Sequence, residues 1–306
     1  MWSSEEIRQE LARVSPSRRC DTLAELSALA HTAGSLHLRG QGKIALHLDL
    51  SSSAVARRAF QLLRDLGVES EIRTYRQRAF GKPTRYQLHV EGSDGARRIL
   101  AEAGVVSRTG APLQHPPKRV VGRECCRSAY VRGALLGAGS VSGPRSPHLE
   151  VRCASLEAAE QLVRLAALDD VTLRARERGR YALAYAKGAD AIAETLALAG
   201  ASDAALLVDE HGVLGAARAH ANRVTNADHA NLVRSSRAAH AQLRAVRRLA
   251  EDGRLETLPA PLREIADLRV RYPALSLREL GRKCRPPATK ASAHRRLSRL
   301  QRLAEI

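Results

Sequence analysis

The stretch CCRSAYVRGALLGAGSVS, at Cys125–Ser142, is dominated by small residues and predicts a helix that packs closely against a neighbour. A second copy, CDTLAELSALAHTAGSLH, lies at Cys20–His37, so the two copies are offset by 105 positions. A glycine inside a helix costs about 1 kcal/mol relative to alanine. Gly133 and Gly137 therefore indicate that another backbone approaches this helix, and we expect the two copies to pack face to face. One copy alone would fit an ordinary Ala-rich core helix better.

The segments that follow the two helices repeat the same order of predicted elements. In the first copy, alternating apolar and polar residues over Lys43–Leu50 predict a half-buried strand, and Ser52 or Ser53 begins an amphipathic helix. Residues 20–104 and residues 125–200 both read helix, two strands, helix, two strands, helix. We therefore predict an α+β fold with a tandem αββαββα duplication.

The composition indicates a polyanionic partner. Of 306 residues, 50 are Lys or Arg and 32 are Asp or Glu, which gives a net charge of +18 and a pI near 10.7. Such a balance favours nucleic acid or an anionic membrane surface, against the alternative of a merely solvated basic surface. No apolar run approaches the ~20 residues of a membrane span. The N-terminus also lacks the apolar core of a secretory signal, so we expect no membrane partner.

The cysteines favour a reducing compartment. Five are present, namely Cys20, Cys125, Cys126, Cys153 and Cys284. Their odd number, the absence of CxxC spacing and the missing signal predict reduced thiols in a cytoplasmic chain. No His or second Cys stands at metal-ligand spacing from any of them, so we expect no metal site and no cofactor.

The C-terminal part predicts a helical DNA-binding domain. From about residue 219 the chain reads as helices and carries 19 basic against 8 acidic residues, which divides the chain into domains 1–218 and 219–306. Within about 258–306, a capped short helix, a tight turn and a basic helix form a helix-turn-helix pattern. The alternative is a basic helical hairpin without groove contacts. The residues that we expect to contact DNA are Thr289, Lys290, Ser292, His294, Arg295, Arg296 and Arg299.

Two further groups of residues are candidates for a role in binding. The first, on or beside predicted strands, offers secondary phosphate contacts and consists of Arg39, Lys43, Arg76, Arg176 and Arg178. A solvated sheet face explains these residues equally well. The second, in the helix that joins the domains, consists of Asn222, Arg223, Asn226 and Asn231. For this group we favour capping or bridging of the domain junction over a contact with DNA.

The duplicated helices resemble a known catalytic motif. Leu26–Leu36 and Val131–Val141 are similar to the LAGLIDADG motif of homing endonucleases. The resemblance implies the tandem fold of that family, in which two four-stranded sheets form a saddle over DNA. In active members each motif carries a penultimate acid, and the two acids bind divalent metal for phosphodiester hydrolysis. These positions are Ala33 and Ala138 here, and alanine can neither bind a cation nor act as a base.

The tail extends the resemblance to nearly the whole chain, which is similar to the WhiA family of sporulation and cell-division regulators of Gram-positive bacteria. The supporting segments are Asn222-Arg223 with Asn226 and Asn231, Leu258-Pro259, Leu262–Ala266, Ser276–Gly281, and Pro286-Pro287 with Thr289-Lys290. The resemblance implies a non-catalytic transcription regulator at the nucleoid that binds double-stranded DNA and, as an additional partner, another transcription regulator. It also implies a monomer with internal pseudo-twofold symmetry.

The recognition helix departs from the usual pattern of that family. Where the family shows Ser-Lys-Ser-Gly and then Asn-His-Arg, only Lys290 and Arg296 keep identity, so the preferred DNA sequence differs. Two alternative functions remain open at the level of the sequence. One is an active or residual LAGLIDADG endonuclease, and the other is an RNA-binding or assembly factor.

Overall fold

The computed structural model describes residues 3–39, 43–76, 84–143 and 147–305. The chain divides into two compact units, one ending at Ala216 and the other beginning at Ala217. The helices of the first unit are α1 (Ser4–Arg13), α2 (Arg19–Ala33), α3 (Ser53–Asp65), α4 (Asp94–Glu102), α5 (Lys118–Val121), α6 (Glu124–Ala138), α7 (Leu156–Ala167) and α8 (Ala189–Ala199). Its strands are β1 (Gly34–Arg39), β2 (Lys43–Leu50), β3 (Glu71–Arg76), β4 (Thr84–Val90), β5 (Gly139–Val141), β6 (His148–Cys153), β7 (Arg174–Arg178) and β8 (Tyr181–Lys187). The remaining helices are α9 (Ser202–Glu251), α10 (Ala260–Arg271), α11 (Leu277–Lys283) and α12 (Lys290–Glu305).

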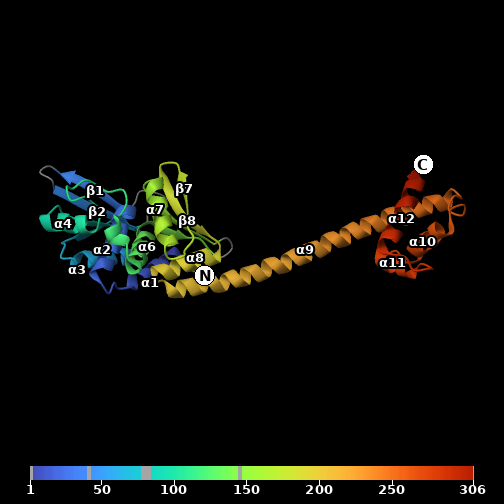
Figure 1. Cartoon of the computed structure of the whole chain (residues 1–306), viewed down its shortest axis with the longest axis horizontal. Helices are drawn as coiled ribbons and strands as arrows, with labels where there is room; N and C mark the ends of the chain where they lie inside the picture. The colour runs from blue at the N-terminus through green and yellow to red at the C-terminus, as the bar shows by residue number, and fades with distance from the viewer. Residues whose placement is uncertain (1–2, 40–42, 77–83, 144–146, 306) are drawn as a thin grey trace. The chain divides into compact units, whose positions relative to one another are not determined.

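Each half of the first unit has the predicted order of elements. The first repeat runs α2, β1, β2, α3, β3, β4 and α4, and the second runs α6, β5, β6, α7, β7, β8 and α8. Each repeat builds one antiparallel sheet, with the strand orders β1-β2-β4-β3 and β5-β6-β8-β7. Figure 1 shows the two repeats side by side, with α2 and α6 between them. The predicted α+β fold with a tandem αββαββα unit is confirmed.

Amphipathic helices cover one face of each sheet and leave the other face open. In the first repeat, α3 begins after Ser52, whose hydroxyl accepts a hydrogen bond from the Ala54 amide at 3.3 Å. Leu62 of this helix is fully buried, as are Leu46 and Leu48 on the inner side of β2. Because successive strand residues turn to opposite sides, the residues between these leucines lie on the open face.

The two small-residue helices form the centre of the first unit. α2 and α6 are buried on nearly all sides and pack directly against each other. A Cβ added to Gly133 would overlap the carbonyl oxygen of Glu25, and a Cβ added to Gly137 would overlap the hydroxyl of Thr32. The face-to-face packing predicted from the glycines is therefore confirmed, and these two glycines permit the close approach.

The second unit has its own hydrophobic core. Leu249 near the end of α9, Leu262 of α10, Leu280 of α11 and Leu297 of α12 are buried in this core. α9 is one helix of 50 residues that begins at Ser202, earlier than the predicted start of the helical region near 219. Over the described ranges, the structure contains no helix that is both long and apolar enough to span a membrane.

Candidate nucleic-acid interface

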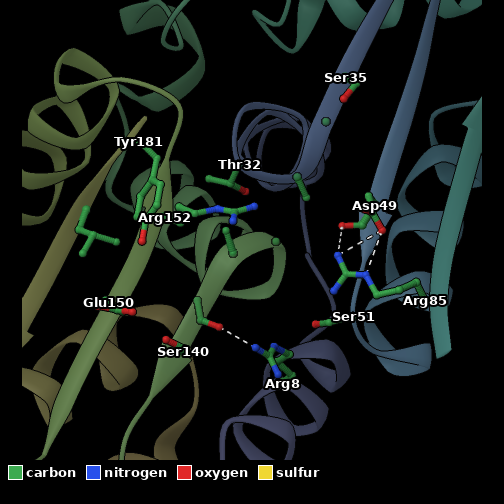
Figure 2. Close-up of a pocket in the computed structure, with 16 residues that line it drawn as sticks. Arg8, Thr32, Ser35, Asp49, Ser51, Arg85, Ser140, Glu150, Arg152 and Tyr181 are labelled. Carbon is green, nitrogen blue, oxygen red and sulfur yellow. Dashed lines mark hydrogen bonds and ion pairs between the residues drawn. The ribbon is translucent and has the colours of Figure 1, made fainter. Parts of the chain in front are cut away.

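A cleft of about 660 Å³ lies where α2 and α6 end and the first strand of each sheet begins. The helix ends contribute Ala33, Gly34, Ala138 and Gly139 to it. Side chains from α1 and from the open faces of both sheets complete the lining, as Figure 2 shows. This is the place where the resemblance to LAGLIDADG enzymes puts the catalytic acids.

The first-repeat side of the cleft holds two arginines, each with a carboxylate partner. The Arg85 guanidinium donates from Nε to Oδ1 of Asp49 at 3.2 Å, and the Tyr75 hydroxyl donates to the same oxygen at 3.1 Å. Arg8 of α1 donates to the Gly139 carbonyl oxygen at 2.7 Å. Burial lowers the pKa of the Arg8 side chain, but an arginine remains charged at neutral pH. Figure 2 shows Arg85 paired with Asp49, whereas Arg8 points to the Gly139 carbonyl, and Nη1 of Arg8 lies 3.7 Å from Oε2 of Glu5.

The second-repeat side also combines a cation with a paired acid. The Arg152 guanidinium lies 5.7 Å from the centroid of the Tyr181 ring, a cation–π distance. The Glu150 carboxylate lies 3.3 Å from Nε2 of His148. Each acid of the cleft thus has a basic partner within its own repeat.

The positions expected to carry catalytic acids offer no ligand atoms. Ala33 and Ala138 face the cleft from the ends of the two helices, and their side chains stop at Cβ. Within the part of the chain that the structure describes, no group of three metal-ligating side chains lies in this cleft. The chemistry of its lining suits an anionic ligand such as a phosphate better than a divalent cation.

A row of arginines lies on the open face of the second sheet. Arg174, Arg176 and Arg178 alternate along β7, so all three turn to the same side of the sheet. The Arg176 guanidinium lies 5.2 Å from the centroid of the Tyr185 ring, and Nζ of Lys187 lies 5.7 Å from the same centroid. Both predicted secondary contacts on this strand, at 176 and 178, are exposed.

The first sheet places its predicted contacts less uniformly. Arg39 and Lys43 pair in register at one end of β1 and β2, and their side chains lie outside what the structure describes. Arg76 lies on the same face of the sheet as Ile72, whereas Tyr75 lies on the open face. Strand alternation places Arg76 on the side of the sheet opposite the open face, where it is exposed, and its contact with DNA stays a prediction.

Three imidazoles cross the open face of the first sheet. The ring centroids of His37 and His47 are 4.2 Å apart, and those of His47 and His89 are 4.1 Å apart. Burial, followed by the charge of the nearby Arg73, lowers the pKa of His89. This row was not predictable from the sequence, because its members come from β1, β2 and β4 and only the strand register brings them together.

The helix-turn-helix is built by two capped helices and a close turn. α11 begins with a capping box, in which the Ser276 hydroxyl accepts from the Glu279 amide at 3.3 Å and the Glu279 carboxylate accepts from the Ser276 amide at 2.8 Å. The Thr289 hydroxyl accepts from the Ser292 amide at 3.2 Å at the start of α12. These bonds satisfy backbone donors that a helix start leaves unpaired.

Most of the predicted DNA contacts are exposed on α12 or directly before it. The exposed members are Thr289, Lys290, His294, Arg295 and Arg299, and Ser292 is half-buried.

Arg296 differs, because it is half-buried and its Nη1 lies 3.8 Å from Oε2 of Glu264 on α10. The side chain turns toward the neighbouring helix, and its contact with DNA stays a prediction. Further exposed cations lie on α11 and in the turn that follows it, and they were not among the predicted DNA contacts. The dense basic run of this segment is the sequence signal for them: Arg278, Arg282, Lys283 and Arg285.

The residues assigned to the domain junction lie inside a continuous helix. Asn222, Arg223, Asn226 and Asn231 are exposed on α9, which runs through this region without a break. Oδ1 of Asn231 accepts a hydrogen bond from Arg234 on the same helix. The predicted capping role is therefore wrong, because no helix end exists here to be capped.

The arrangement of the cysteines differs from the prediction, made from their spacing, that none of them has further metal ligands nearby. Cys20, Asp21, Cys125 and Cys126 come together from α2 and α6, and their ligand atoms all lie within 4.8 Å of one another. Burial and the neighbouring thiols raise the pKa of Cys126 to about 12. Spacing along the chain did not reveal this cluster, because the two halves are supplied by helices 105 residues apart.

Three family models match successive parts of the chain. They are the WhiA N-terminal LAGLIDADG-like domain over residues 19–106, the WhiA LAGLIDADG-like domain over residues 127–218, and the WhiA C-terminal HTH domain over residues 221–304. Together they cover the helices and strands described above except α1, α5 and short parts of α6, α9 and α12.

Individual relatives extend over the same length. A probable cell division protein WhiA from Heliobacterium modesticaldum is 36% identical over 307 residues, covering 100% of this chain and 96% of the relative. Its counterpart from Symbiobacterium thermophilum is also 36% identical and covers 98% of this chain and 96% of the relative. The crystal structure of full-length DUF199/WhiA from Thermatoga maritima aligns with a TM-score of 0.57 at 24% identity, covering 100% of this chain and 98% of that chain, which shows a common fold.

Proposed function

Because the chain belongs to the WhiA family, we propose that it is a transcription regulator that binds double-stranded DNA and does not cleave it. Its targets on this proposal are genes of cell division, since the curated relatives are named probable cell division proteins. By the resemblance drawn from the sequence, the targets include genes of sporulation.

The observation that carries the proposal is the exposed basic side of the helix-turn-helix. Lys290, Arg295 and Arg299 are exposed on α12, and no acidic side chain of the described residues forms an ion pair with them. A helix of this kind reads base edges in the major groove, where arginine pairs well with guanine. The net charge of +18 supplies the long-range attraction to the phosphate backbone.

The first unit supports the proposal as a secondary anion-binding surface. Arg85 and Arg152 of its cleft and the arginines of β7 lie on the open faces of the two sheets, and Arg8 of α1 lies beside them in the cleft. Phosphate contacts of this kind orient a protein on duplex DNA without reading its sequence. The absence of acids at Ala33 and Ala138 argues that the bound strand is not cut.

The experiment begins with genome-wide mapping of the bound DNA, with and without residues 219–306. A duplex from a recovered site then serves in fluorescence anisotropy titrations at several salt concentrations. Arg295→Ala should weaken binding by about 1–3 kcal/mol if Arg295 contacts a base. If Arg295 contacts a phosphate instead, the slope of log affinity against log salt concentration should fall by about 1. Unchanged occupancy without residues 219–306 would contradict the proposal.

Two variants serve as matched controls. Arg64→Ala removes one exposed charge from α3, away from the open faces, and should leave binding unchanged. Arg296→Ala breaks the pairing with Glu264 and should lower the stability of the second unit while keeping the salt slope. A loss of DNA affinity shared equally by Arg64→Ala and Arg295→Ala would indicate general charge attraction only.

Two further assays separate the alternative functions. Supercoiled plasmid carrying the mapped site is incubated with Mg²⁺ or Mn²⁺, and clean metal-dependent strand scission would establish a nuclease instead. Binding to duplex DNA, duplex RNA and single-stranded RNA is compared at matched salt. Preference for either RNA would favour the RNA-binding reading.

A further inference from the structure

A cluster of four potential metal ligands lies at the beginning of the two central helices. Cys20 and Asp21 are the second and third residues of α2, and Cys125 and Cys126 are the second and third residues of α6. Packing of the two helices brings all four ligand atoms within 4.8 Å of one another. The cluster is at the opposite end of both helices from the cleft, so it is separate from the candidate DNA surface.

The spacing of the ligand atoms fits one tetrahedral ion. With Zn–S bonds of about 2.3 Å, two thiolates on one tetrahedral zinc are about 3.8 Å apart, and a thiolate and a carboxylate oxygen are about 3.5 Å apart. The Sγ atoms of Cys125 and Cys126 are 3.9 Å apart. Oδ1 of Asp21 lies 3.4 Å from Sγ of Cys20 and 3.8 Å from Sγ of Cys126. These separations require only small side-chain movements to enclose an ion.

The carboxylate in the cluster is poorly explained without a cation. Asp21 is only 6% exposed, and no Lys or Arg of the described residues forms an ion pair with it. Its side chain accepts hydrogen bonds from two thiols, which are weak donors. A buried carboxylate without a cation is costly, whereas a buried carboxylate that binds a metal is common.

Positive charge lies close to the sulfur atoms and opposes the burial that raises the pKa of Cys126. Both helix N-termini lie at the cluster, and the partial positive charge of a helix start stabilises a thiolate. Nη1 of Arg18 lies 3.9 Å from Sγ of Cys125. A cavity of about 580 Å³ lined by Arg18, Arg123 and Cys125 reaches the cluster from the surface and provides a path of entry.

We propose that Cys20, Asp21, Cys125 and Cys126 bind one Zn²⁺ ion that joins the N-terminal ends of α2 and α6. Three soft sulfur donors and one oxygen donor select zinc over the hard cations Mg²⁺ and Ca²⁺, which take oxygen ligands. All four positions of a tetrahedral ion are filled by protein, which is typical of a structural site rather than a catalytic one. The ion connects the two repeats directly, because each repeat supplies two of its ligands.

The first test measures metal in the full-length protein, purified under reducing conditions with an affinity tag that does not bind metal. Elemental mass spectrometry of the acid-digested protein should find one zinc ion per chain. The variant Cys20→Ser/Cys125→Ser/Cys126→Ser should lose the metal. Cys153→Ala, which removes a buried thiol of β6 outside the cluster, should retain it. Zinc retained by the triple variant, or zinc absent from the wild-type protein, overturns the proposal.

The second measurement starts from the wild-type protein, and the fold of its single variant is checked separately. Wild-type protein stripped of metal is titrated with Co²⁺, and a tetrahedral thiolate site should give a thiolate-to-cobalt charge-transfer band and intense visible bands. Asp21→Asn, a conservative change, should weaken Co²⁺ binding while circular dichroism stays unchanged. The absence of these bands overturns the proposal. So does a disulfide between any two of the three cysteines in protein isolated directly from cells.

Discussion

Glu25 of α2 and Arg132 of α6 form a buried ion pair across the interface of the two repeats, with Nε of Arg132 donating to Oε2 of Glu25 at 2.9 Å. Arg58 of α3 adds two bonds to the same carboxylate, at 2.7 and 2.9 Å. All three side chains are at most 6% exposed. Arg132 also donates to the Ala199 carbonyl oxygen at 3.2 Å, so this triad ties four helices together.

Glu25→Gln should strongly destabilise the first unit. Removing one partner of a buried ion pair costs about 3–5 kcal/mol, because the remaining charges stay buried without compensation. The measurement is chemical denaturation followed by circular dichroism. Glu102→Gln, which breaks the exposed pair with Arg19, is the control and should cost about 1 kcal/mol or less. Equal losses in the two variants would contradict the importance of the buried triad.

Gly133→Ala should also destabilise the first unit, although alanine is the better helix former. The added Cβ would overlap the backbone carbonyl of Glu25 and approach Cβ of Ala28 to 2.8 Å, so the helices must separate. Overpacking of this kind costs about 1–3 kcal/mol. Gly215→Ala on α9 meets nothing within 4 Å and should be neutral or stabilising by up to about 1 kcal/mol. Thermal unfolding of both variants checks the expected difference in sign.

Gly281→Ala should affect the second unit alone. A Cβ at this position would overlap the carbonyl oxygen of Ala288, where the turn between α11 and α12 passes close to α11. The Ala288 amide also donates to the Gly281 carbonyl oxygen at 2.8 Å. We expect loss of DNA affinity together with a lower unfolding temperature of the second unit. Hydrogen exchange should show unchanged protection in α2 and α6, and a loss there would refute this assignment.

Acidification should destabilise the first unit in part through His31. Burial lowers the pKa of this side chain, whose Nδ1 lies 2.8 Å from the Ser27 carbonyl oxygen and whose Nε2 lies 3.2 Å from that of Leu113. As the pH falls below about 6.5, the unfolded chain takes up a proton that the folded chain resists. Stability is therefore retained above this pH and lost below it.

The check compares unfolding free energies at several pH values between neutral and mildly acidic conditions. His31→Gln should show a weaker dependence on pH than the wild-type protein. His294→Gln, at an exposed position on α12, should show the same dependence as the wild-type protein. An identical pH dependence in the wild-type protein and His31→Gln would exclude His31 as a cause.

Much of the fold could be predicted from local sequence patterns. The strand over Lys43–Leu50 and the helix starts after Ser52 and Ser276 were predictable, because alternation and capping are properties of short segments. The duplication was predictable because small residues, strands and caps recur in the same order. The close packing of α2 and α6 followed from two glycines that have no other reason to stand in a helix.

Features that depend on pairing between distant segments were not predictable. The inward turn of Arg296 depends on Glu264 of another helix, and the side of the sheet on which Arg76 lies depends on strand register. The cysteine cluster needs two helices 105 residues apart. The helix around Asn222 was predicted, but the capping role favoured for it was wrong, because asparagine is common at helix ends and is also tolerated on an exposed helix surface.

The buried triad makes the two repeats unequal partners. At an offset of 105 positions, Glu25 corresponds to Tyr130 and Arg132 corresponds to Ser27. A pair made from two first repeats would place Glu25 opposite a serine, and a pair made from two second repeats would place Arg132 opposite a tyrosine. Each half therefore discriminates against a copy of itself. The two halves therefore pair inside one chain as two different partners, and neither can take the place of the other at this contact.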